Sequence, residues 1–176
     1  LFEKTEYGGK LGFTSSSSDI SLYYYNYDDR MPYYETTSDS VFPVILHLNE
    51  KHQRMSSAGV ATAFEGFGFM FRGEFLQTQN KKFNTIDATG IGQFQTTENV
   101  FVASAETPSM NGYIFATQFS DSTLANNPSS SLRTRYQSLV SFRLQKTLSQ
   151  EHSFEVIYTM APYDKGGIVS GNYYWP

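Results

Sequence analysis

Arg72 and Glu74 are the charged residues whose spacing says most about chemistry, because they fill the gaps of the segment F-G-F-M-F-R-G-E-F at 67–75. Every second residue of this segment is phenylalanine except at position 73. A period of two is typical of a β-strand, so one face is aromatic and the other carries opposite charges. In a barrel, inward charges either pair with one another or line a water-filled pore and set its selectivity.

The same alternation sends other polar side chains inward. The two signs of charge are nearly balanced among them, which argues against a strongly ion-selective pore and favours pairing. Together with Arg72 and Glu74, the predicted lumen-lining residues are Lys10, Glu106, Gln118, Arg143 and Glu155. The predicted lipid-facing residues on the opposite side are Phe64, Phe67, Phe69, Phe71, Phe75, Phe115, Phe119, Phe142, Phe154 and Tyr158.

No constellation for catalysis or cofactor binding emerges. His47 and His52 flank Glu50, but on a strand the two histidines point to opposite faces, so joint zinc ligation requires a loop. His152 and Ser153 are adjacent and also face opposite ways, and the G-x-S-x-G motif is absent. We therefore predict a protein that is not an enzyme and has no cofactor or metal. Acids that could offer oxygen ligands to Ca²⁺, yet match no EF-hand loop, are Asp28-Asp29 and Asp87 with Glu98.

The composition excludes several classes of protein. The chain has 176 residues and no cysteine, so disulfide frameworks and thiolate sites are absent. A net charge of −4 without a long basic run argues against nucleic acid as a partner. No window reaches the ~20 apolar residues of a membrane-spanning helix, but barrel strands need only ~9–11 residues with polarity hidden on one face. The many tyrosines and phenylalanines favour strands.

The elements that must position these side chains are strands joined by connections of two lengths. Eight segments have strand character, at 3–13, 19–27, 54–64, 67–78, 99–107, 113–120, 135–146 and 152–161. Short turns alternate with long external loops at 28–53, 79–98 and 121–134. Tight periplasmic turns and long external loops are typical of outer-membrane barrels. We predict an all-β, antiparallel up-and-down transmembrane β-barrel, with residues 1–176 forming a single barrel segment.

Two finer expectations follow from this scheme. A two-residue turn at Glu65-Gly66 places Phe64 opposite Phe67. With eight strands both ends of the chain lie on the external side, whereas a complete single-chain barrel begins and ends in the periplasm. We therefore expect a piece of a larger barrel. Tyrosines crowd the strand ends, as in an interfacial girdle, although tyrosine suits any half-exposed strand.

Residues 20–34, I-S-L-Y-Y-Y-N-Y-D-D-R-M-P-Y-Y, resemble the strand-then-loop segments of large Gram-negative outer-membrane proteins. They are most similar to an uncharacterised, porin-like barrel family with repeated Y-Y-x-N-Y-x-x-R-x-P elements. The later G-F-M-F-R-G-E-F followed by N-K-K-F-N looks like the R-G-E strand and loop of the same family. Together the two patches cover about a third of the chain. The resemblance implies an outer-membrane barrel and assigns no activity. The chain lacks the N-terminal region and the final aromatic-ended strand of a full member, which leaves the strand number open.

Taken together, the sequence predicts a bacterial outer-membrane protein that is a porin-like passive channel for small solutes. Its expected partners are outer-membrane lipid and lipopolysaccharide, the solutes themselves, and proteins at the external loops or in the lumen. The alternative is a secreted soluble β-sandwich or barrel that binds carbohydrate or a protein through exposed aromatics. A requirement for detergent separates the two.

Overall fold

The computed structural model describes residues 5–38, 46–87, 90–132, 136–148, 152–163 and 165–174. All regular elements in this part are strands with antiparallel pairing, which confirms the prediction of an all-β antiparallel fold. No helix in these residues is long and apolar enough to cross a membrane. The strands are β1 (Tyr7–Thr14), β2 (Ser18–Asp28), β3 (Tyr33–Ser38), β4 (Leu46–Lys51), β5 (Arg54–Gly66), β6 (Phe69–Asp87), β7 (Gly90–Glu106), β8 (Tyr113–Leu124), β9 (Tyr136–Thr147), β10 (Ser153–Ala161) and β11 (Gly166–Tyr174).

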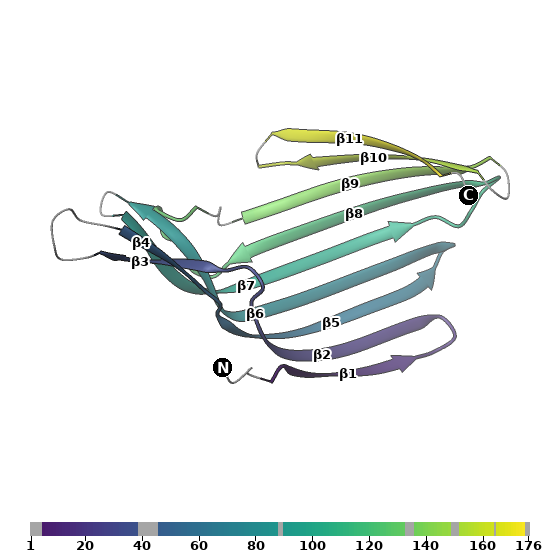
Figure 1. Ribbon diagram of the computed structural model, residues 1–176. Helices are drawn as coiled ribbons and strands as arrows, with labels where there is room; N and C mark the ends of the chain where they lie inside the picture. The colour runs from purple at the N-terminus through teal and green to yellow at the C-terminus, as the bar shows by residue number, and fades with distance from the viewer. Residues whose placement is uncertain are drawn as a thin grey trace.

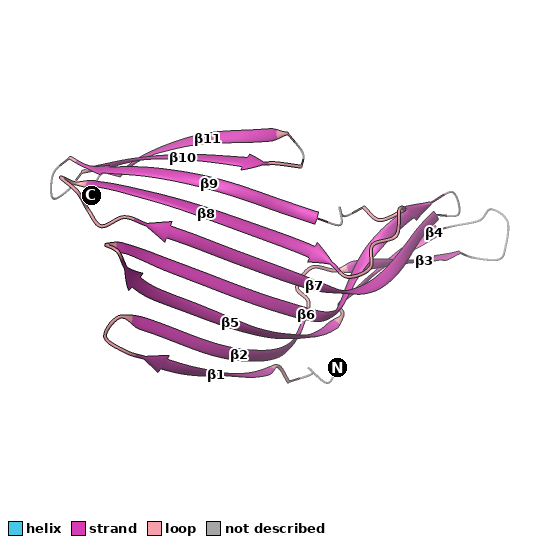
Figure 2. Cartoon of the chain, turned by 180° about the vertical axis from the view of Figure 1, so that it is seen from behind, coloured by secondary structure: helices cyan, strands magenta, loops and turns pink. Residues whose placement is uncertain are grey.

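Nine of these strands form one continuous, twisted sheet in the order β1-β2-β5-β6-β7-β8-β9-β10-β11 (Figure 1). The β1–β2, β5–β6 and β7–β8 connections lie at one end, and the β3–β4 hairpin projects from the other end beside the tips of β6 and β7 (Figure 2). We call these the short-turn end and the loop end. Among the described residues β1 and β11 pair with no further strand on their outer sides, so the sheet is open.

The predicted long loops contain more strand than expected. The segment 28–53 holds the β3–β4 hairpin, and the segment 79–98 is mostly the continuation of β6 and β7 past a bulge between Thr78 and Lys81. β8 likewise continues to Leu124. Turn-forming and polar residues suggested loops here, but the ladder hydrogen bonds between β6 and β7 continue regardless of side-chain type. The loop end therefore extends the sheet.

β11 is a ninth crossing that the sequence prediction missed. Its residues, G-G-I-V-S-G-N-Y-Y, contain three glycines, which weaken the alternating signal of a strand. With β11 present, the first and last strands of the sheet start at the same end, and β11 finishes at the short-turn end (Figure 1). The expectation that both ends of the chain lie on the same side is therefore wrong for the described sheet.

The turn between β5 and β6 falls two residues later than predicted. Its central residues are Phe67 and Gly68, with φ values of 54° and 77°. Positive φ at both positions identifies a type I′ turn, which matches the twist of the flanking strands. Phe64 accordingly pairs with Phe71 instead of Phe67, and the Phe67 side chain is fully exposed at the tip of the turn. Phe67 is thus a turn residue and does not belong to the face of the other phenylalanines.

Replacing Phe67 with asparagine is expected to stabilise the chain by about 0.5–1 kcal/mol, because asparagine tolerates the left-handed conformation better than phenylalanine. Urea unfolding of the refolded protein measures the change. Phe67→Ala is the matched control, since it removes the exposed ring but keeps a residue that disfavours positive φ. An equal gain in both variants would show that exposure of the ring, and not the turn conformation, is the source of the effect.

Buried side chains concentrate at the loop end. Leu124 is fully buried, and Tyr33 and Met55 are almost so, while most large apolar side chains of the sheet are exposed. The segment after Leu124 returns to β6, where the backbone N–H of Ile86 donates to the carbonyl of Ser130 at 2.9 Å. The described core therefore sits where the extended β6–β7 hairpin meets its neighbouring segments, and the rest of the sheet has no second layer.

Candidate functional site

The strand registers give the nine-stranded sheet two faces of opposite character. Partner residues in a ladder point to the same side, so the pairings propagate each face from β1 to β11. We call them the polar face and the apolar face. The polar face carries all seven predicted lumen-lining residues: Lys10, Arg72, Glu74, Glu106, Gln118, Arg143 and Glu155. The apolar face carries Phe64, Phe69, Phe71, Phe75, Phe115, Phe119, Phe142, Phe154 and Tyr158.

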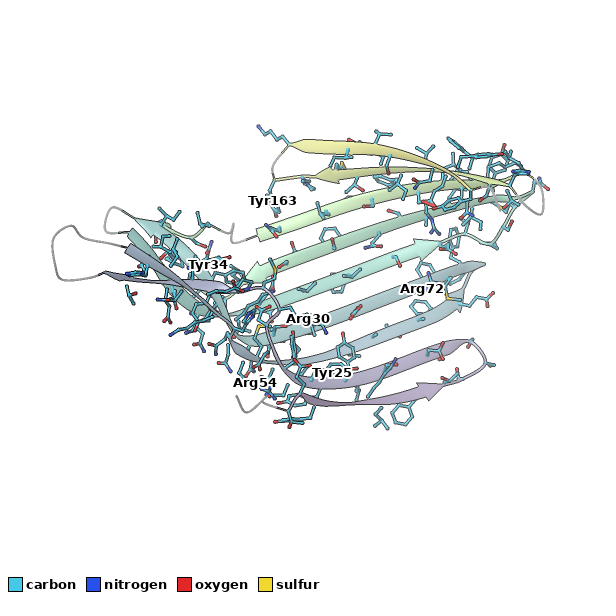
Figure 3. The ribbon with its side chains drawn as sticks, in the orientation of Figure 1. Tyr25, Arg30, Tyr34, Arg54, Arg72 and Tyr163 are labelled. Atoms are coloured by element: carbon cyan, nitrogen blue, oxygen red, sulfur yellow. The ribbon has the colours of Figure 1, made fainter. Side chains whose placement is uncertain are left out.

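Towards the short-turn end, the polar face carries a cluster of Arg72, Glu106 and Arg143, which come from β6, β7 and β9 (Figure 3). Arg143 Nη2 donates to Glu106 Oε2 at 2.7 Å, and Arg72 Nη1 lies 3.7 Å from the same oxygen. The register pairs Ala116 of β8 with both Glu106 and Arg143. Because alanine is short, the two long side chains meet above it. One carboxylate therefore neutralises one of two guanidinium groups and leaves the cluster with a net charge of +1.

Glu74 lies outside this cluster and is bound by a residue of β2, which is two strands away from β6 in the sheet. The Tyr23 hydroxyl donates to Glu74 Oε1, and its ring passes over Gly59 of β5. A Cβ atom at position 59 would lie only 2.5 Å from Tyr23 Cζ, so the crossing requires glycine. Two hollows of about 420 and 330 Å³ adjoin at Arg72, the first against Glu74 and the second against Glu106. Gln118 lines both hollows.

Lys10 and Glu155 share the polar face but lie outside the cluster of Arg72, Glu106 and Arg143. Lys10 is exposed on β1, next to Tyr23 in the register. Glu155 on β10 is 8% exposed and accepts a hydrogen bond of 3.4 Å from the Tyr174 hydroxyl. The structure therefore brings five of the seven predicted residues to adjoining hollows and leaves these two near the sheet edges.

The apolar face is an exposed band with polar borders. Phe115 and Phe142 are 48% and 47% exposed, with no protein layer over them in the described part of the chain. Towards the loop end the band stops at hydrogen-bonded polar pairs, Gln77 with Asn99 and Ser138 with Asp121. Towards the short-turn end it stops at Lys146, whose Nζ lies 3.7 Å from the Tyr113 ring centroid. From Tyr113 to Asp121 the band is about nine residues long, as a tilted transmembrane strand requires.

Polar contacts also hold the loop end together. Lys81 Nζ donates to the buried Glu98, which also accepts from Ser122 Oγ at 2.7 Å. In the β3–β4 hairpin Lys51 Nζ lies 2.5 Å from Glu35 Oε2. The hydrogen bond from Lys51 lowers the pKa of Glu35 and raises the pKa of Lys51. This ion pair therefore contributes at neutral pH and is lost as the pH falls through the lowered pKa of Glu35.

The histidines and loop acids do not assemble into a metal or catalytic site within the described ranges. No group of three or more histidine, aspartate or glutamate side chains there could hold a metal ion. His52 Nδ1 lies 2.6 Å from the carbonyl of Asp29 and ties the β2 end to the hairpin. His152 Nδ1 lies 2.9 Å from the Tyr173 hydroxyl, and the two rings are stacked with centroids 5.9 Å apart. The side chain of Asp87 lies outside the described residues.

A row of tyrosines on β2 was not predicted as part of a site. Tyr23, Tyr25 and Tyr27 alternate on the polar face, whereas Tyr24 points to the apolar face. The period of two within Y-Y-Y-N-Y could have separated them, but the density of tyrosine suggested an interfacial girdle instead. The row lies beside a hollow of about 620 Å³.

Comparisons with known proteins found no family model, no curated protein and no solved structure that matches the chain.

Proposed function

We propose that the nine-stranded sheet is part of the wall of a bacterial outer-membrane β-barrel, and that the barrel is a porin-like passive channel for small solutes. The observation that carries the proposal is the apolar face, which is exposed across the whole sheet. The accessible surface is 12357 Å² at a mass of 20.0 kDa. A compact soluble monomer of this mass exposes roughly 8,700 Å². The excess comes from both faces of a single-layer sheet, and lipid would cover the apolar one.

The arrangement of the connections also supports the proposal. The β1–β2, β5–β6 and β7–β8 connections lie at one end of the sheet, and the extended β3–β4 and β6–β7 hairpins with the packed core lie at the other, as periplasmic turns and external loops do in outer-membrane barrels (Figure 1). The short β10–β11 connection is the exception, because it lies at the loop end (Figure 1). Lipopolysaccharide would then surround the loop end. The polar face would line the lumen, where its hollows and partly paired charges leave room for water and small solutes.

Strand direction sets a condition on how such a barrel closes. In an antiparallel sheet of nine strands, β1 and β11 run in the same direction. Joining them directly would create one parallel pair, whereas bacterial outer-membrane barrels are antiparallel throughout with an even number of strands. We therefore propose that closure adds an odd number of strands, supplied by the same polypeptide or by a partner chain.

Paired cysteine labels test which medium each face contacts. The chain has no cysteine, so Phe142→Cys on the apolar face and Ser141→Cys on the polar face each give one labelling position. In vesicles that contain brominated lipid, we expect strong quenching of a fluorophore at 142 and weak quenching at 141. Water-soluble iodide should give the reverse order. Equal access of iodide to both labels would contradict a membrane location.

The channel activity needs a separate measurement in planar bilayers. We expect stable conductance steps once the sheet is closed by its additional strands, and greater permeability to small than to large neutral solutes in liposome swelling. If no conductance is observed but the quenching pattern is as expected, the sheet lies in the membrane without forming an open pore. A soluble β-sandwich requires a second layer over the apolar face, and no described segment supplies one.

A further inference from the structure

The tyrosine row of β2, defined by Tyr23, Tyr25 and Tyr27, forms one wall of a hollow that the ion-pair cluster does not share. The hollow has a volume of about 620 Å³ and lies at the loop-end half of the polar face. Arg30 and Glu6 also line it. Figure 3 shows Tyr25 and Arg30 near this end of the sheet, whereas Arg72 lies towards the short-turn end.

Neighbouring contacts hold the tyrosine rings in place. The Tyr23 hydroxyl is bound by Glu74, and the Tyr27 hydroxyl lies 3.0 Å from Ser57 Oγ, which itself lies 2.8 Å from Thr78 Oγ1. Side chains held in this way lose little further freedom when a ligand binds, so the binding free energy is not spent on ordering them.

Tyr25 stands between these two fixed tyrosines and is the exposed member of the row. It is 44% exposed, and its ring lies across Gly8 of β1, where a Cβ atom would come within 2.3 Å of Tyr25 Cδ1. The glycine lets the ring lie along the sheet, with its outer face towards the hollow. The centroids of the Tyr23 and Tyr25 rings are 6.1 Å apart and the ring planes are tilted by 43°. A ligand can therefore stack on one side of this platform but cannot be sandwiched between two parallel rings.

The polar groups around the platform include both donors and acceptors. Arg30 lines the hollow and has no ion pair among the described residues, so no described carboxylate occupies its guanidinium donors. Glu6 accepts the backbone N–H of Asp28 through Oε1 at 3.2 Å, which leaves its other oxygen as an acceptor. Sugar hydroxyls need donors and acceptors together, and one acid beside one base favours a neutral ligand.

We propose that this hollow binds a neutral saccharide, with the C–H face of a sugar ring on Tyr25 and hydroxyl groups on Arg30 and Glu6. A flat nucleobase fits less well, because the tilted rings cannot hold it from both sides. The proposal deepens the proposed function by naming the solute class. It rests on that function only in requiring that the polar face is open to water.

Titration calorimetry of the refolded 176-residue chain with maltohexaose and cellohexaose tests the site, with trigalacturonate as the acidic comparison. At least one neutral hexasaccharide should bind in the millimolar range or tighter. Tyr25→Ala should weaken that binding by about tenfold or more, a change that corresponds to about 1.4 kcal/mol. Tyr25→Phe should bind within about twofold of the parent, since stacking needs the ring and not the hydroxyl.

Tyr24→Ala is the matched control, because Tyr24 is the adjacent residue on the opposite face and should leave saccharide affinity unchanged. The proposal is overturned if neither hexasaccharide binds, if only trigalacturonate binds, or if Tyr24→Ala weakens binding as much as Tyr25→Ala. Lipid quenching at position 142, measured on the same protein, separates the outcomes. Quenching without saccharide binding rejects the site alone, and saccharide binding without quenching rejects the membrane location.

Discussion

Replacing Phe142 with arginine is expected to destabilise the sheet in a bilayer by about 2–4 kcal/mol, the cost of a charge near the membrane midplane. Phe142 lies in the middle of the apolar band on β9, between the polar border at Ser138 and that at Lys146. Its side chain is 47% exposed, so the cost comes from the surrounding medium more than from lost protein contacts. Urea unfolding in liposomes, followed by heat-modifiable gel mobility, measures the change.

Gln118→Glu is the control for this substitution. Gln118 pairs with Ser141, the neighbour of Phe142, and both side chains lie on the polar face. A carboxylate there stays in water beside Arg72 and should lower stability by less than about 0.5 kcal/mol. If Phe142→Arg also costs this little, the apolar face is bathed in water and the outer-membrane proposal fails.

Replacing Glu106 with glutamine is expected to cost about 1–2 kcal/mol of stability, because it removes the carboxylate shared by Arg143 and Arg72. The cost stays below that of a fully buried pair, since the Glu106 and Arg143 side chains are 28% and 34% exposed. The same change raises the charge of the cluster from +1 to +2. In planar bilayers the reversal potential under a salt gradient should therefore shift towards that of chloride.

Glu74→Gln makes the same change in net charge on the same face without unpairing the arginines. Its amide oxygen can still accept from the Tyr23 hydroxyl, so a stability loss of less than about 0.5 kcal/mol is expected. The double variant Glu106→Gln with Arg143→Gln should recover most of the stability lost in Glu106→Gln. If Glu74→Gln lowers stability as much as Glu106→Gln does, the effect comes from the change in net charge and not from the loss of the ion pair.

The two faces could be predicted from the sequence because alternation is a local property. Arg72 and Glu74 lie on the face opposite to Phe71 and Phe75 because neighbouring residues of any strand point to opposite sides, whichever strands pair with it. This rule gives the face of every predicted lumen-lining and lipid-facing residue except Phe67. Phe67 differs because phenylalanine in a left-handed turn carries no turn signal, while the preceding Glu65-Gly66 looked more suitable.

The contacts of the site could not be predicted because they depend on register between distant strands. The meeting of Glu106 with Arg143 requires that both pair with Ala116, which lies on the strand between them. The row of tyrosines similarly depends on the pairing of Gly8 with Tyr25. The β3–β4 hairpin escaped notice because its threonines and polar residues show no apolar alternation.

The β2–β5 pairing also bears on how the sheet assembles. Every other ladder of the nine-stranded sheet joins strands that follow each other in the chain, whereas Asp28 must meet Arg54 across the β3–β4 segment. Local pairings form quickly, and a pairing across a longer segment is slower because more chain entropy is lost before any contact forms. The β3–β4 hairpin shortens that segment by pairing within it. We therefore expect β1–β2 and the block from β5 to β11 to form as separate units whose joining limits the folding rate.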